Sequence, residues 1–156
     1  MKNIKKILIA LIVIMVISCF FIYTYLADAS ALSNIIVDVE NINIQQIGLS
    51  YCDLKIIVSL SNPTDRDTSN LKASFDIYIA GNYIGDGSLS DVSISALSNT
   101  QKEVFVTIYY SEVASAVVDG IKKGDFTLSI EGDVSGTVLF GLIRVSEQIE
   151  ASKTYL

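Results

Sequence analysis

The chain has 156 residues, of which 51% are hydrophobic, and its mean hydropathy of +0.49 is too apolar for a wholly soluble protein of ordinary composition. Beyond residue 27, 8 basic residues face 17 acidic residues, a net charge of −9. That part repels nucleic acid and anionic lipid surfaces, so we expect no nucleic acid partner. The sequence has no histidine and two cysteines, Cys19 and Cys52, so a zinc site or a Cys–His dyad lacks the residues it needs.

A basic N-terminus precedes a long uncharged segment. Lys2, Lys5 and Lys6 lie in residues 1–6, and Asp28 is the next charged residue. A helix over residues 7–27 is about 32 Å long, enough to cross a hydrocarbon core of about 30 Å. The lysines predict a cytoplasmic N-terminus and an extracytoplasmic remainder. We therefore predict a single-pass anchor in the cell membrane, with apolar residues Ile7, Leu8, Ile9, Leu11, Ile12, Val13, Ile14, Met15, Val16, Ile17, Phe20, Phe21 and Ile22.

Two other interpretations of this segment stay open. Ala27-Asp28-Ala29 fits a signal-peptide site whose cleavage between Ala29 and Ser30 gives a secreted protein, but the apolar run is longer than the ~7–15 residues of a typical signal peptide. Val16-Ile17-Ser18-Cys19 resembles a lipobox, but an apolar stretch rather than a polar tether follows Cys19. The retained anchor fits the length best. Residues 28–34 are then a short link to a domain over residues 35–156.

The first part of that domain has the period-two alternation of half-buried strands. Residues 35–47 alternate with a change of phase that predicts a bulge near Asn41. Residues 51–61 end at Asn62-Pro63, and Pro63 is the only proline of the chain. Because proline fixes its own φ and keeps the preceding residue from the helical region, a turn is predicted there. The apolar face of this second strand is Leu54, Ile56, Val58 and Leu60.

Further strands and one helix are predicted in the rest of the chain. Ser111 to Lys123 is predicted as a helix, because Ser111 is a good N-cap and Gly124 suits the C-cap. About seven strands and one short helix in about 125 residues predict a mainly β fold, an immunoglobulin-like or fibronectin-III-like antiparallel β-sandwich behind one transmembrane helix. The remaining strands are predicted over 71–79, 91–96, 103–110, 126–130 and 137–145, with turns at Gly81-Asn82 and from Gly132 to Gly136.

This pattern resembles the LEA14-like family, the group 2 late embryogenesis abundant proteins with the WHy (water stress and hypersensitive response) domain. Asn62 and Pro63, at the end of an alternating strand, form the sharpest motif of the resemblance. Residues 75–87 and 95–108 and the position of the helix extend it. The resemblance implies a folded β-sandwich associated with desiccation or other stress, without catalytic residues or a cofactor. An anchored, extracytoplasmic copy departs from the soluble plant form.

Other polar and reactive groups have ordinary structural interpretations. Asp65 and Asp67 flank Arg66 and lack the spacing of a calcium loop, so a solvated turn is preferred to a metal site. None of the 17 acidic residues has the apolar sequence context of a catalytic carboxyl group. Cys52 is expected to be buried in its strand. Cross-strand packing is expected for the tyrosines Tyr78, Tyr83, Tyr109 and Tyr110.

These observations together predict a non-enzymatic, membrane-anchored LEA14-like domain that protects or binds envelope components under desiccation or osmotic stress. Two alternatives stay open. One is a module that binds or transfers lipids or other hydrophobic ligands, with an acyl chain held between the sheets. The other is a structural module of a surface assembly, in which an edge strand pairs with a neighbour. The expected partners are the membrane and other envelope proteins or lipids.

Overall fold

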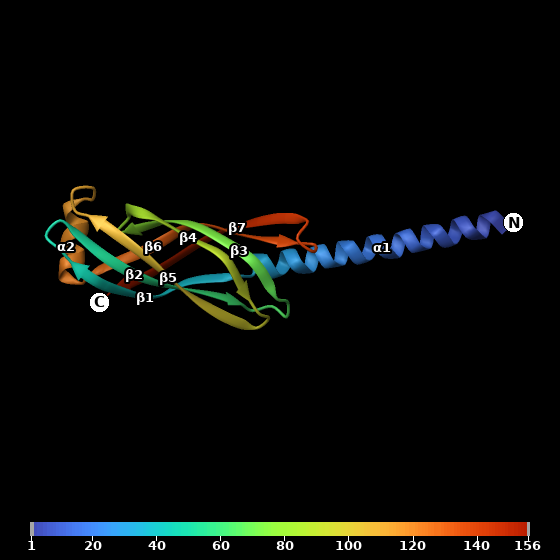
Figure 1. Cartoon of the computed structure of the whole chain (residues 1–156), viewed down its shortest axis with the longest axis horizontal. Coiled ribbons are helices and arrows are strands. Elements are labelled where there is room, and N and C mark those ends of the chain that lie inside the picture. The colour runs from blue at the N-terminus through green and yellow to red at the C-terminus, as the bar shows by residue number, and fades with distance from the viewer. Residues whose placement is uncertain (1, 156) are drawn as a thin grey trace.

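The computed structural model describes residues 2–155, with side chains from residue 4 onward, as a long helix followed by a β-sandwich (Figure 1). All strand pairs are antiparallel, in one sheet of order β1-β2-β5 and a second of order β4-β3-β6-β7. The predicted mainly β fold is confirmed. The elements are α1 (Lys2–Ser33), β1 (Ile36–Ile47), β2 (Tyr51–Asn62), β3 (Thr68–Ile79), β4 (Asn82–Ile94), β5 (Ser98–Tyr109), α2 (Ser115–Lys123), β6 (Phe126–Val138) and β7 (Ile143–Tyr155).

The core lies between the two sheets and follows the predicted alternation. Every second residue of β2 from Cys52 to Asn62 is fully buried, and the residues between them are half exposed. Ile77 and Ile79 of β3 and Leu128 and Ile130 of β6 are likewise inaccessible to solvent. The predicted bulge near Asn41 is confirmed, because the register between β1 and β2 shifts between Val39 and Asn41.

The short helix begins later than predicted. The sequence predicted a helix from Ser111, but α2 starts at Ser115, and its N-cap, Ala114, makes no side-chain hydrogen bond. Residues before it form a turn in which the backbone N–H of Glu112 donates to the carbonyl of Tyr109. The other end is as predicted, since Gly124 is a left-handed C-cap with φ of 66°.

Two predicted turns are displaced. The β3–β4 turn is formed by Ala80 and Gly81 rather than Gly81 and Asn82, because both Ala80 and Gly81 take positive φ and Asn82 already belongs to β4. The predicted turn from Gly132 to Gly136 is wrong: β6 continues through it to Val138. Gly132 faces Phe75 of β3, and a Cβ at Gly132 would lie 2.5 Å from Phe75 Cα. This glycine permits a close approach of two strands, not a turn.

The segment predicted as a link, residues 28–34, is helical as far as Ser33. The small residues of this segment do not indicate in the sequence where the helix ends. Ala31 and Leu32 are buried against the sandwich. Gly136 of β6 leaves the room that Leu32 occupies, because a Cβ there would lie 3.0 Å from Leu32 Cδ1. α1 thus runs without interruption from the apolar segment into the domain (Figure 1).

We predict that Gly132→Ala lowers the free energy of unfolding by about 3 kcal/mol, because the backbone of β3 must shift to admit the methyl group. Thermal and urea unfolding of the full chain in a non-ionic detergent, followed by circular dichroism, measures the loss.

Gly81→Ala is the matched control for the effect of a methyl group alone. Gly81 has φ of +76° and nothing within 4 Å of an added Cβ, so its substitution costs only the left-handed conformation, about 1 to 2 kcal/mol. Equal losses in the two variants would contradict the steric explanation for Gly132.

Candidate functional site

The junction between α1 and the sandwich is the candidate functional site. Two loops contact the C-terminal part of α1 at this end of the domain, residues 63–67 and 139–142, and a third loop, residues 95–97, lies at the same end, whereas α2 and the C-terminus lie at the opposite end (Figure 1). The backbone N–H of Leu97 donates to the carbonyl of Thr64 at 2.9 Å, which joins the first and third loops. The junction is therefore built by segments far apart in the sequence.

Asn62 is the buried polar centre of these loops. It has the inward parity of β2 and is fully buried, so its amide must find partners within the protein. Its Nδ2 donates to the carbonyl of Arg66 at 2.6 Å, and to the carbonyls of Ile94 and Ser95 at 3.4 Å each. Its Oδ1 accepts from both the backbone N–H and the hydroxyl of Thr64, at 3.1 and 2.7 Å. One side chain thus fixes the turn after Pro63 and the end of β4.

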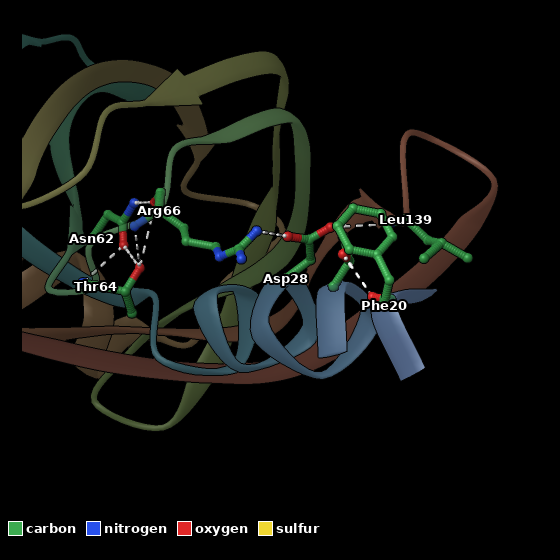
Figure 2. A network of polar contacts seen from close by, with 7 residues as sticks. Phe20, Asp28, Asn62, Thr64, Arg66 and Leu139 are labelled. Atoms are coloured by element: carbon green, nitrogen blue, oxygen red, sulfur yellow. Dashed lines mark hydrogen bonds and ion pairs between the residues drawn. The ribbon is translucent and has the colours of Figure 1, made fainter. Parts of the chain in front are cut away.

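The turn that Asn62 fixes carries Arg66 to α1. The guanidinium Nη1 of Arg66 donates to Oδ1 of Asp28 at 2.9 Å, and the backbone N–H of Leu139 donates to Oδ2 of the same carboxylate at 3.1 Å (Figure 2). The guanidinium also lies over the ring of Tyr23, 5.9 Å from its centroid. Asp28, the first charge after the apolar segment, therefore connects α1 to two loops at once.

An open cleft of about 450 Å³ lies beside this network. Thr24 and Asp28 of α1 form one wall, and Arg66, Phe140 and Gly141 contribute from the loops. The Arg66 and Asp28 side chains are 35% and 25% exposed, so their ion pair is partly screened by water and stabilises the junction modestly. The arrangement holds a helix on a domain; it contains no nucleophile paired with a base.

The predicted membrane-spanning residues all lie on α1, with side chains 43% to 68% exposed on the free part of the helix. Residues 4–33 are long and apolar enough to cross a membrane, a property that signal sequences share. Cys52 is buried in β2, as expected, whereas Cys19 is exposed within this part of α1, and both thiols are free. Burial, and secondarily the charge of Asp53, raises the pKa of the Cys52 thiol, so it is a weak nucleophile at neutral pH.

Asp67 of the β2–β3 loop serves the backbone. Its Oδ1 accepts from the N–H of Ala96 at 2.8 Å, a second direct bond between this loop and residues 95–97. Within the described residues, no three His, Cys, Asp or Glu side chains are placed to hold a metal ion.

The predicted cross-strand packing of Tyr78 and Tyr83 is confirmed, with ring centroids 6.0 Å apart in an edge-to-face arrangement.

A row of carboxylates on the outer face of the second sheet was missed by sequence reasoning. Asp86, Asp76, Glu131 and Glu150 are successive register partners across β4, β3, β6 and β7. Desolvation, and then the charges of this row, raise the pKa of the neighbouring Tyr78 and Tyr83 hydroxyls. Only the register would have found the row, because its members are 10 to 74 positions apart in the sequence.

Two antiparallel sheets packed face to face, with the short helix α2 at one end, make the domain a β-sandwich. Among solved structures, the solution structure of AT1g01470 from Arabidopsis thaliana is similar to this chain with a TM-score of 0.59 and 19% sequence identity, over 80% of this chain and 82% of that one. The LEA14-like fold predicted from the sequence is confirmed. At that identity the likeness shows the fold alone.

Two other solved structures match this chain with TM-scores below 0.5, which is too low to support a conclusion. One is that of At2g46140.1, a protein assigned to the late embryogenesis abundant (LEA) class, with 21% identity over 91% of this chain and 86% of that one, at a TM-score of 0.43. The other is that of Bacteroides uniformis beta-glucuronidase 2, of which only 14% is covered, at 11% identity and a TM-score of 0.46. No protein-family model matches the chain, and no curated protein sequence matches it.

We predict that Asn62→Ala lowers the free energy of unfolding by about 2 to 3 kcal/mol, because buried backbone carbonyls lose their donor. The loops it joins should also open, so amide hydrogen exchange should accelerate across residues 63–67 and 95–97. Both effects are measured on the full chain, by urea unfolding and by hydrogen exchange with mass spectrometry.

The matched control is Asn99→Ala. Asn99 is exposed at the start of β5, at the same end of the sandwich, and its loss should change stability by less than about 0.5 kcal/mol. If Asn62→Ala behaves like this control, Asn62 does not organise the junction.

Proposed function

We propose that this protein is a single-pass membrane protein with a cytoplasmic N-terminus, whose LEA14-like domain stands outside the membrane and protects or binds envelope components under desiccation or osmotic stress. The role is non-enzymatic and needs no cofactor. Residues 7–27 are the retained anchor, and Asn62 and Pro63 are the motif through which the domain meets it. Two findings support the fold and the anchoring in this proposal: the LEA14-like fold and an N-terminal apolar helix of spanning length.

The observation that carries the proposal is the use of Asp28 by the domain. Cleavage between Ala29 and Ser30 would remove Asp28 and leave the guanidinium of Arg66 and the N–H of Leu139 without their acceptor. It would also remove Thr24, which is 7% exposed where α1 enters the junction. A cleavable signal sequence has no reason to contribute buried and hydrogen-bonded residues to the mature fold. These contacts favour retention of the helix.

The packing of the sandwich favours a surface role over a carrier role. An acyl chain between the sheets would need the space that the core already fills. Ile56, Leu60, Ile77 and Leu128, which face one another from the two sheets, are each 0% exposed. Binding at the outer surface or at the membrane end of the domain requires no such rearrangement.

Retention of the anchor predicts that the protein isolated from membranes keeps its N-terminus. An intact mass beginning at Met1 or Lys2 is expected from mass spectrometry of the detergent-solubilised protein. A mass beginning at Ser30 would instead establish a secreted protein, and a lipid-modified mass beginning at Cys19 would establish a lipoprotein. Either result would overturn the anchored arrangement.

The protective role predicts that the full chain, reconstituted in lipid nanodiscs, reduces the aggregation of an envelope protein during drying and rehydration. Light scattering after rehydration measures the effect, with empty nanodiscs of the same lipid as the control. Gly132→Ala provides a second control, because a destabilised sandwich on the same anchor should protect less. Aggregation equal to that with empty nanodiscs would refute the protective role without affecting the anchoring.

A further inference from the structure

The tip of the β6–β7 hairpin, residues 139–143, is an exposed apolar loop. Phe140 is 73% exposed, Leu142 is 75% exposed and Ile143 is 40% exposed. No charged residue occurs between Asp133 and Arg144, so the tip and the end of β6 that leads into it are uncharged. Exposed clusters of large apolar side chains on an otherwise acidic domain mark a surface that is covered in use.

The backbone of this tip is poorly suited to the residues it carries. Leu139, Phe140 and Gly141 have φ of 53°, 59° and 85°, all in the left-handed region. Glycine and asparagine favour this region, and bulky residues enter it only at an energetic cost. Turn formation alone therefore does not favour Leu139 and Phe140 at this position, and Leu97 takes a similar φ of 54° in the β4–β5 loop.

The tip lies where α1 would leave the membrane. The N–H of Leu139 donates to the carboxylate of Asp28. Phe140 and Gly141 line the same cleft as Thr24, which lies about one helical turn, or about 6 Å, nearer the N-terminus of α1 than Asp28. In Figure 1 the β6–β7 hairpin reaches further along α1 toward the N-terminus than the other loops at that end. The uncharged segment from Lys6 to Asp28 measures about 33 Å as a helix, which places Asp28 at the outer boundary of a bilayer.

We propose that the β6–β7 tip inserts Phe140 and Leu142 into the interfacial region of the outer leaflet, beside α1, as a second contact of this chain with the lipid bilayer. The inference rests on the membrane anchoring proposed above and deepens it. Arg144, exposed and directly after the apolar tip, then lies at the level of the lipid phosphates, where its guanidinium is favoured. Two contacts on one rigid body fix the tilt and rotation of the sandwich relative to the membrane, which one helix alone does not.

The chain contains no tryptophan, so single tryptophans report local environment without background. Phe140→Trp probes the tip and Leu11→Trp probes the anchor. Tyr83→Trp probes solvent, at a 54% exposed position beside the β3–β4 turn, which is bonded to Thr127 just after α2. Each full-length variant is reconstituted in phosphatidylcholine vesicles, with and without brominated acyl chains, and titrated with acrylamide. We expect a blue-shifted emission, loss of intensity in brominated vesicles and protection from acrylamide for Phe140→Trp, and none of these for Tyr83→Trp.

Other outcomes separate this inference from the anchoring. If Phe140→Trp emits like Tyr83→Trp while Leu11→Trp is quenched by brominated lipid, the anchor stands and the inserted tip is refuted. If Phe140→Trp is protected from acrylamide but not quenched by brominated lipid, a protein or a second copy covers the tip, and lipid is refuted as the occupant. If Leu11→Trp is not quenched either, the anchoring fails and this inference fails with it.

Discussion

The burial of the Asn62 amide is the constraint on which the junction depends. An amide with the inward parity of a core strand must satisfy its donors and acceptor inside the protein, since water cannot reach it. The partners it finds are the backbones of two loops, so the loops cannot move independently of β2 or of each other. Arg66 is held by this turn through its own carbonyl. Its guanidinium is consequently presented to α1 from a rigid base instead of a mobile loop.

Asp28 extends that rigidity to the helix. Its two carboxylate oxygens accept from different loops, and one of the donors is a backbone N–H that no substitution except proline removes. Leu32 adds an apolar contact in the space left by Gly136. A flexible link would let the domain sample every orientation allowed by its length. Here the helix continues into the domain, so the orientation of the sandwich follows the orientation of the anchor.

Most of the strands could be predicted from the sequence because alternation is local, and the alternation of β2 even contains the inward position of Asn62. The strand predicted over 137–145 is wrong, because the chain turns at residues 139–142 and β7 begins only at Ile143. The junction could not be predicted. Asp28 and Arg66 are 38 residues apart, and Leu32 is buried only because Gly136, more than a hundred positions later, lacks a side chain. The sequence predicts a turn at Gly132 because long-range contacts are not visible in it. A glycine that makes room for a neighbouring strand cannot be distinguished in the sequence from a glycine that turns the chain. Ser111 likewise has good N-cap chemistry, but the turn after Tyr109 delays the helix to Ser115.

If α1 spans a membrane as proposed, a domain fixed rigidly to it acts on what lies within its own length of the bilayer. Strands of 12 to 13 residues rise about 40 Å, so the α2 end stands at about that distance from the lipid when the junction end rests on it. The long sides of the sandwich carry the carboxylate row and the acidic excess, which keep anionic lipid at a distance. Only the end that holds the Asp28 network combines apolar tips with a contact to the anchor. In the proposed anchored arrangement, the same loops that seat the helix set which face of the domain meets the membrane, and the outer faces are left free for the proposed envelope partners.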